Sequence, residues 1–96
     1  MRLTELRSNF RSKILTIAAE CNVSTVKVFG STARGDAKEN SDIDFLISLK
    51  KNASLLDVGR FKWKIEELLN KKVDIAFENC VHASIKNQVI KEAQVL

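Results

Sequence analysis

The segment Asp42–Leu49 constrains the fold of this chain more than any other, because a run of apolar residues opens with two aspartates. Side chains alternate between the faces of a strand, so this segment carries Asp42 and Asp44 on one face and large apolar side chains on the other. Aspartate is depleted from strands, so the pair calls for an explanation. Two carboxylates on one face suit hard cations. The alternative is a solvated or lysine-paired strand end.

A small, glycine-bounded segment precedes these aspartates. Gly30 follows a β-branched stretch and begins Gly-Ser-Thr-Ala-Arg-Gly, and ten residues separate Ser31 from Asp42. Glycine allows a sharp turn and removes a Cβ that would block a phosphate, while Ser31 adds a hydroxyl and the next amides offer N–H groups. A simple turn with Ser31 as helix cap is the alternative. With the carboxylates, the pattern predicts a Mg²⁺-dependent, nucleotide-using site.

Two further residues are candidates for this site. Asp74 lies in the predicted strand Val73–Phe77; if that strand pairs with Asp42–Leu49, Asp74 can ligate a metal and accept a proton from an attacking hydroxyl. Alternatively, Asp74 faces water on an edge strand. Arg34 either contacts a phosphate or pairs with Asp42 or Asp44.

Hydrophobic periodicity predicts alternating helices and strands. Helices are expected over 2–20, from Thr32 or Ala33, over 55–70 and over 81–96; strands are expected over 24–29, 42–49 and 73–77. Ser54 is expected to cap the third helix. The apolar stripe of that helix comprises Leu55, Val58, Phe61, Ile65, Leu68 and Leu69. The fold class is therefore α/β (α+β), with a small sheet covered by helices.

Length and composition indicate one domain over 1–96. We find no signal-peptide pattern and no apolar segment of membrane-spanning length, so a cytoplasmic location without a membrane partner is expected. The net charge of +4 comes from basic residues spread along the chain, so solvated surfaces are expected rather than a nucleic-acid groove.

Four residues outside the motif are also interpreted. Cys21 and Cys80 are expected to act as small apolar side chains. Trp63 either packs over the edge of the core or anchors a protein partner. His82, at the start of the last predicted helix, is expected at the surface or as a cap.

The spacing Gly30-Ser31, ten residues, Asp42-Ile43-Asp44 resembles the nucleotidyltransferase superfamily that includes DNA polymerase beta and kanamycin nucleotidyltransferase. The fuller string Gly-Ser-x-Ala-Arg-Gly…Ser-Asp-Ile-Asp resembles the minimal nucleotidyltransferase (MNT) proteins along nearly the whole chain. The resemblance implies a mixed sheet flanked by helices. It also implies that Asp42, Asp44 and Asp74 are the catalytic, metal-binding carboxylates and that Gly30 and Ser31 form the triphosphate-binding turn.

The resemblance further implies Mg²⁺-dependent transfer of AMP from ATP, with two metal ions. Many MNT proteins are antitoxins encoded beside a HEPN-domain ribonuclease toxin, so the expected acceptor is a tyrosine hydroxyl of such a toxin, in a type VII-like pair. A hetero-oligomer with the toxin or a homodimer is expected. The alternative is a non-catalytic antitoxin that binds and masks the toxin. A nucleic-acid-binding module, the third hypothesis, rests on charge alone.

Overall fold

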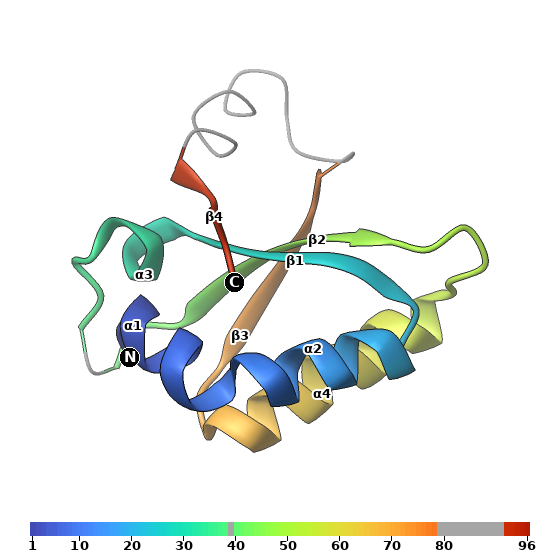
Figure 1. Ribbon diagram of the computed structural model, residues 1–96, viewed down its shortest axis with the longest axis horizontal. Helices are drawn as coiled ribbons and strands as arrows, with labels where there is room; N and C mark the ends of the chain where they lie inside the picture. Colours follow the sequence, from blue (N-terminus) through green and yellow to red (C-terminus); the bar gives the residue numbers. More distant parts are fainter. Residues whose placement is uncertain (39, 79–91) are drawn as a thin grey trace.

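The computed structural model describes residues 1–38, 40–78 and 92–96. Four strands form one mixed sheet in the order β3-β2-β1-β4 (Figure 1). They are β1 (Val23–Phe29), β2 (Ile43–Leu49), β3 (Val73–Phe77) and β4 (Gln94–Val95). β1 runs antiparallel to β2 and β4, whereas β2 and β3 are parallel. The expected fold class, a small mixed sheet with helices, is confirmed.

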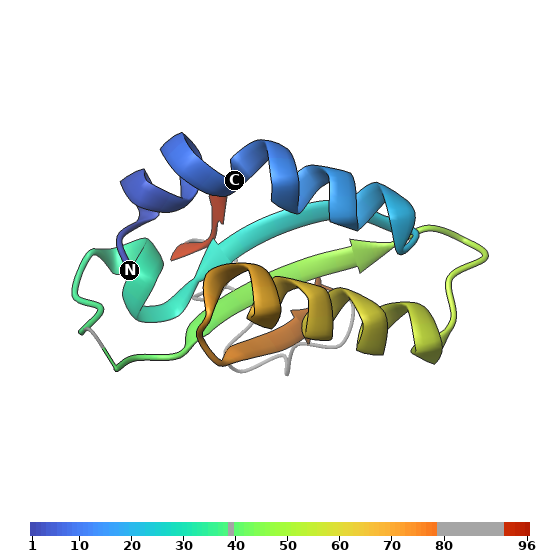
Figure 2. The ribbon, with the colours of Figure 1, turned by 90° about the horizontal axis from the view of Figure 1, so that it is seen from below.

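The two long helices lie side by side on one face of the sheet (Figure 2). The expected helix over 2–20 forms as α1 (Leu3–Glu5), a π-helical stretch η1 (Leu6–Phe10) and α2 (Arg11–Glu20). The third expected helix forms as α4 (Leu55–Leu69), and it supplies the crossover that a parallel β2–β3 pair requires. Among the residues that the structure describes, none of the helices could cross a membrane.

The core lies between this helical layer and the sheet. Phe45 of β2 is fully buried, and its ring meets the ring of Phe61 of α4 edge to face, with 6.5 Å between the centroids and an interplanar angle of 82°. Cys21 is fully buried and unpaired, as expected of a small apolar side chain. The other core residues are Leu6, Ile14, Ala18, Val23, Val26, Val28, Ile43, Ile47, Ile65, Leu69, Val73 and Leu96.

The prediction of a helix over 81–96 is wrong at its end, because Gln94–Val95 forms β4 against β1. The start of that helix, Cys80 and His82 lie outside the described residues. Two arginines hold the terminus: Arg7 donates to the carbonyl of Val95 at 2.6 Å, and Arg11 donates to that of Leu96 at 3.1 Å. Long-range contacts of this kind override local helical periodicity.

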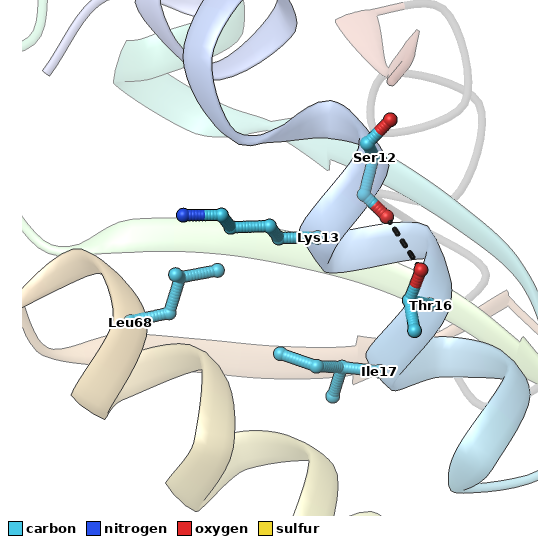
Figure 3. A pocket seen from close by; sticks show the side chains of 5 residues that line it. All are labelled: Ser12, Lys13, Thr16, Ile17 and Leu68. Atoms are coloured by element: carbon cyan, nitrogen blue, oxygen red, sulfur yellow. Dashed lines mark hydrogen bonds between the residues drawn. The ribbon is translucent and has the colours of Figure 1, made fainter.

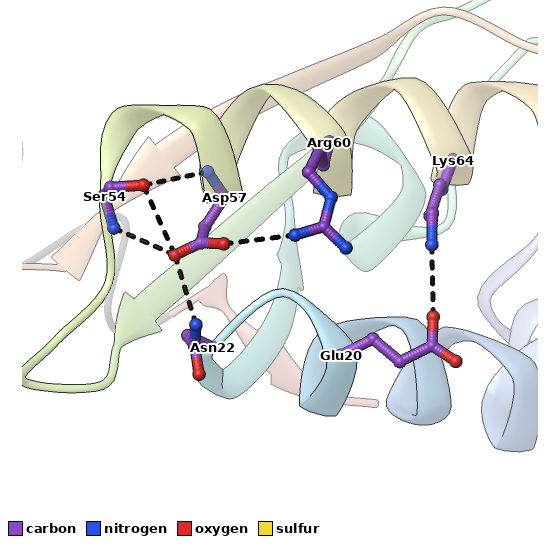
Figure 4. A network of polar contacts seen from close by, with 6 residues as sticks. All are labelled: Glu20, Asn22, Ser54, Asp57, Arg60 and Lys64. Atoms are coloured by element: carbon purple, nitrogen blue, oxygen red, sulfur yellow. Dashed lines mark hydrogen bonds and ion pairs between the residues drawn. The ribbon is translucent and has the colours of Figure 1, made fainter.

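The start of α4 is fixed by a capping box, as the sequence predicts for Ser54. The Ser54 hydroxyl accepts from the Asp57 N–H, and an Asp57 carboxylate oxygen accepts from the Ser54 N–H at 3.0 Å. Asn22 and Arg60 also donate to this carboxylate (Figure 4). The hydrogen bond from the Ser54 backbone, and next the one from the Asn22 side chain, lower the pKa of Asp57. The network joins the end of α2 to the start of α4.

Two predictions about the surface of α4 are settled by exposure. Leu55, expected in the buried stripe, is 86% exposed, so this part of the prediction is wrong and the fully buried apolar residues of α4 begin at Phe61. Trp63 is 62% exposed, so it does not pack over the edge of the core. Its neighbour on the same face, Leu56, is also exposed.

We predict that Ser54→Ala lowers the free energy of unfolding by about 1 kcal/mol, because it leaves the first turn of α4 without its cap. Urea denaturation measures this change. Ser8→Ala, at an exposed position, is the matched control and should stay within about 0.5 kcal/mol of the parent. Equal stability of the two variants would contradict the assigned cap.

Candidate active site

Three strand ends meet at one point of the sheet. In the register, Asp44 of β2 lies opposite Phe29, the last residue of β1, and also opposite Asp74 of β3. Asp42 directly precedes β2, two residues before Asp44 and on the same face. Because β3 does lie beside β2, the predicted convergence of Asp74 with the aspartate pair is confirmed. Among the described strands β3 is also an outer strand of the sheet and Asp74 is exposed, as the alternative predicted, so its role as a metal ligand and proton acceptor stays a prediction.

The electrostatic environment of Asp44 also indicates that the three carboxylates lie close together. The pKa of Asp44 is raised, first by partial burial of its carboxylate and then by the negative charges of Asp74 and Asp42. A hydrogen bond between the Asp44 and Asp74 carboxyl groups raises it further, and the charge of Arg34 opposes these effects. Like charges held this close cost folding energy, which a bound cation would remove.

This donor set fits a magnesium ion. In the part of the chain that the structure describes, no three carboxylate, cysteine or histidine groups gather tightly enough to hold a metal ion by themselves. Mg²⁺ does not need such a cage, because it keeps several waters and binds through one or two carboxylates together with substrate phosphates. Asp42 and Asp44, with Asp74 adjacent, can supply those carboxylates.

Gly30 lies against the carboxylate of Asp44. A Cβ built on Gly30 would overlap the Oδ2 atom of Asp44 and lie 3.2 Å from its Cγ, and the φ of +71° is itself a glycine conformation. This glycine therefore allows the turn after β1 to touch the carboxylate face. A phosphate bound at the turn would lie next to the carboxylate of Asp44.

Gly30 also begins the short helix α3 (Gly30–Arg34), whose N-cap is Phe29. The prediction that Ser31 caps a helix beginning at Thr32 or Ala33 is therefore wrong: Ser31 is the second helical residue. Its N–H is among those that have no partner within a helix, so the turn still presents donors. The Ser31 carbonyl accepts from Gly35 and Asp36, both at 3.0 Å, which closes the helix.

Arg34 pairs with neither Asp42 nor Asp44, so that alternative is wrong. Its guanidinium contacts Asp36 at 3.3 Å and Glu92 at 3.2 Å. It remains close enough for its charge to lower the pKa of Asp44. Arg34 thus lies at the edge of the carboxylate cluster and is half exposed.

Two cavities differ sharply in character. A groove of 350 Å³ between α2 and α4 is lined mainly by apolar atoms, and its lining residues are Ser12, Lys13, Thr16, Ile17 and Leu68 (Figure 3). None of the three candidate carboxylates lines it. A polar pocket of 390 Å³ adjoins Asp42 instead. It is lined by Asn40, Ser41, Asp42, Asn70, Lys71 and Lys72. We place the chemistry beside the polar pocket because it contains one of the site carboxylates.

Lys72 lines the polar pocket but is not among the candidate site residues predicted from the sequence, where it is one of the basic residues spread along the chain. The available signal was its position two residues before Asp74, since residues two apart share a strand face. That signal becomes informative once β3 is known to pair with β2.

Comparison with known proteins agrees with this geometry. The sequence pattern of the family described as "Nucleotidyltransferase domain" matches residues 8–96. The chain belongs to this family. It is therefore an enzyme of the nucleotidyltransferase class, with the carboxylates and the glycine turn in the arrangement that the motif predicts.

Two curated relatives match this nucleotidyltransferase over nearly its full length. A Methanocaldococcus jannaschii protein assigned to the protein adenylyltransferases is 38% identical over 86 residues, covering 90% of this chain and 92% of the relative. Protein adenylyltransferase MntA of Thermococcus cleftensis is 30% identical over 92 residues, covering 96% and 93%. A solved structure described as a minimal nucleotidyltransferase is 40% identical, with a TM-score of 0.85 and coverage of 100% and 97%.

More distant solved structures share the fold. A toxin–antitoxin structure with AMP-PNP has a TM-score of 0.73 at 19% identity, covering 90% of this chain and 71% of that one. The complex of a tri-AMPylated Shewanella oneidensis HEPN toxin with an MNT antitoxin has a TM-score of 0.63 at 16% identity, covering 88% of this chain and 66% of that one.

We predict that Asp44→Asn raises the melting temperature at about pH 7 without Mg²⁺, because it removes a carboxylate whose ionised form the fold disfavours. The folded pKa of Asp44 is raised, so the folded chain binds this proton more tightly than the unfolded chain. The melting temperature of the parent should therefore rise relative to that of the variant as the pH falls towards that raised pKa.

Asp57→Asn is the control of opposite sign, because the pKa of Asp57 is lowered. This substitution should lower the melting temperature at neutral pH. The difference from the parent should become smaller as the pH falls through the usual pKa range of aspartate and below. A lower melting temperature for Asp44→Asn at neutral pH would contradict the assigned repulsion.

Proposed function

We propose that this chain transfers AMP from ATP to a hydroxyl group of a HEPN-domain toxin, a tyrosine in the first instance, and thereby acts as the antitoxin of a type VII-like pair. The observation that carries the proposal is the placement of Asp44 against the Gly30 turn, with Asp42 and Asp74 beside Asp44. The adenylyltransferase names of the relatives, and the toxin–antitoxin structures that share the fold, support the same reaction.

Different groups of the chain bind the phosphates of ATP and the metal ions. The N–H groups at the start of α3 and the hydroxyl of Ser31 bind the β- and γ-phosphates, since Gly30 lets them approach the carboxylates. Asp42 and Asp44 would hold the magnesium ions, and Asp74 would add a third carboxylate. When bound, the metal neutralises charge on the phosphates and on the leaving pyrophosphate. Arg34 adds positive charge at the edge of the site.

Transfer is a displacement at the α-phosphorus. The acceptor oxygen forms a bond to this phosphorus while the bond to the bridging oxygen of the β-phosphate breaks, so pyrophosphate leaves with that electron pair. Asp74 accepts the proton of the hydroxyl, because it lies on the other side of Asp44 from the Gly30 turn. The products are an AMP ester of the toxin and pyrophosphate.

Masking without chemistry is the second candidate, and one observation favours it. Leu55, Leu56 and Trp63 expose large apolar surfaces on α4, away from the carboxylates. Such residues suit contact with another protein. Binding through α4 would neutralise a toxin even if no AMP were transferred.

We predict that the chain, mixed with the HEPN protein encoded beside its gene, ATP and Mg²⁺, adds one or more AMP units to that protein. Intact-mass spectrometry of both proteins measures the transfer. Asp44→Asn should reduce the rate by more than the roughly 10–100-fold that loss of a residue supporting a metal ligand costs. Trp63→Ala is the control for contact and should weaken the complex while leaving the carboxylates in place.

Unchanged transfer by Asp44→Asn would contradict the catalytic assignment. No transfer by the parent, together with a complex that Trp63→Ala weakens, would favour masking. Removal of Mg²⁺ with a chelator should abolish transfer, and transfer without a divalent cation would contradict the metal role of the carboxylates.

A further inference from the structure

The polar pocket beside Asp42 has the composition of an anion-binding site. Two basic residues, two asparagines, a serine and one carboxylate, that of Asp42, line it, from the segment before β2 and the turn before β3, so basic and neutral donors outnumber the acid. This combination offers ammonium, amide and hydroxyl donors. The pocket therefore suits an anionic group.

The strand register places Lys72 at the centre of this argument. Ile43 lies opposite Val73, and the Ile43 N–H donates to the Lys72 carbonyl at 3.1 Å, so Lys72 lies beside Asp42 one step before the strands begin. Val73 is buried whereas Lys72 and Asp74 are exposed, which puts the latter two on the carboxylate face. Within the described residues, Lys72 forms no ion pair.

The direction of the displacement at the α-phosphorus indicates what the β3 side of the site would bind. In the proposed function the β- and γ-phosphates lie at Gly30, which follows β1, so pyrophosphate would leave towards β1. An in-line nucleophile must arrive from the opposite side. β3 flanks β2 opposite to β1, so the acceptor enters over Asp74 and the polar pocket.

We propose that this pocket is the acceptor subsite and that Lys72 binds an anionic group carried by the acceptor. The inference rests on the proposed function, because the direction of entry follows from the transfer reaction. The anion is either the phosphate of an AMP unit already attached to the acceptor or an acidic side chain next to the acceptor hydroxyl. If the anion is the phosphate of an attached AMP unit, Lys72 favours the addition of further AMP units. If the anion is an acidic side chain, Lys72 selects the hydroxyl that receives the first AMP unit.

The test is a titration of the isotope-labelled full chain, followed by amide NMR. Mg²⁺ and AMP-PNP first fill the nucleotide site, and their effect on the Gly30 and Ser31 amides reports on the proposed function separately. AMP is then added as the phosphate probe, and N-acetyl-glutamate amide as the carboxylate probe. We expect shifts at Asn40, Ser41, Asn70 and Lys72.

Lys72→Gln should weaken binding of the effective probe about threefold to tenfold, as expected for loss of one charged donor. Lys62→Gln, at an exposed position of α4, is the matched control and should bind as the parent does. Binding of AMP identifies a phosphate on the acceptor, and binding of the glutamate probe alone identifies an acidic side chain. No shift at the pocket with either probe, or equal binding by the two variants, would overturn the proposal.

Failure of the inference and failure of the proposed function are distinguishable. If AMP-PNP leaves Gly30 and Ser31 unshifted, the nucleotide assignment is contradicted, and the same probes added to the chain alone still decide whether Lys72 binds an anion. If AMP-PNP binds and the pocket stays silent, the acceptor assignment alone is wrong.

Discussion

The parallel pairing of β2 with β3 is the constraint on which the rest of the site depends. Its register sets Asp44 opposite Asp74 and brings Lys72 beside Asp42. A shift of one residue would turn Asp74 to the helix-covered face and replace it with an apolar side chain. The crossover through α4 makes the parallel pairing possible, and so the capping box at Ser54 and the Phe45–Phe61 contact support the site from a distance.

The carboxylate cluster lowers the stability of the folded chain, and a bound cation would offset this loss. Asp44 is held partly buried, beside two other carboxylates and against a glycine in a left-handed conformation. Burial and like charge are unfavourable for the carboxylate of Asp44, whereas the left-handed backbone costs a glycine little, and a bound cation would offset the first two. Magnesium and nucleotide should therefore stabilise the fold by binding to the folded chain.

The sequence predicted the parts of this arrangement that local chemistry determines. Capping by Ser54 and the use of Gly30 follow from short-range geometry, and the paired aspartates follow from strand alternation. The cap by Ser31 failed because Gly30 itself enters the helix, which moves the cap to Phe29. The strand at Gln94–Val95 and the position of Lys72 depend on pairing between distant segments, which no local pattern encodes.

The central claim is that the carboxylates at the start of β2 hold divalent metal next to the phosphates of ATP. The most direct test is a crystal of the chain with Mn²⁺ in place of Mg²⁺ and AMP-PNP in place of ATP, measured by anomalous diffraction. We predict anomalous density at Asp42 and Asp44, with Asp74 adjacent and the β- and γ-phosphates at Gly30 and Ser31. Manganese bound elsewhere, or phosphates bound away from the Gly30 turn, would contradict the account.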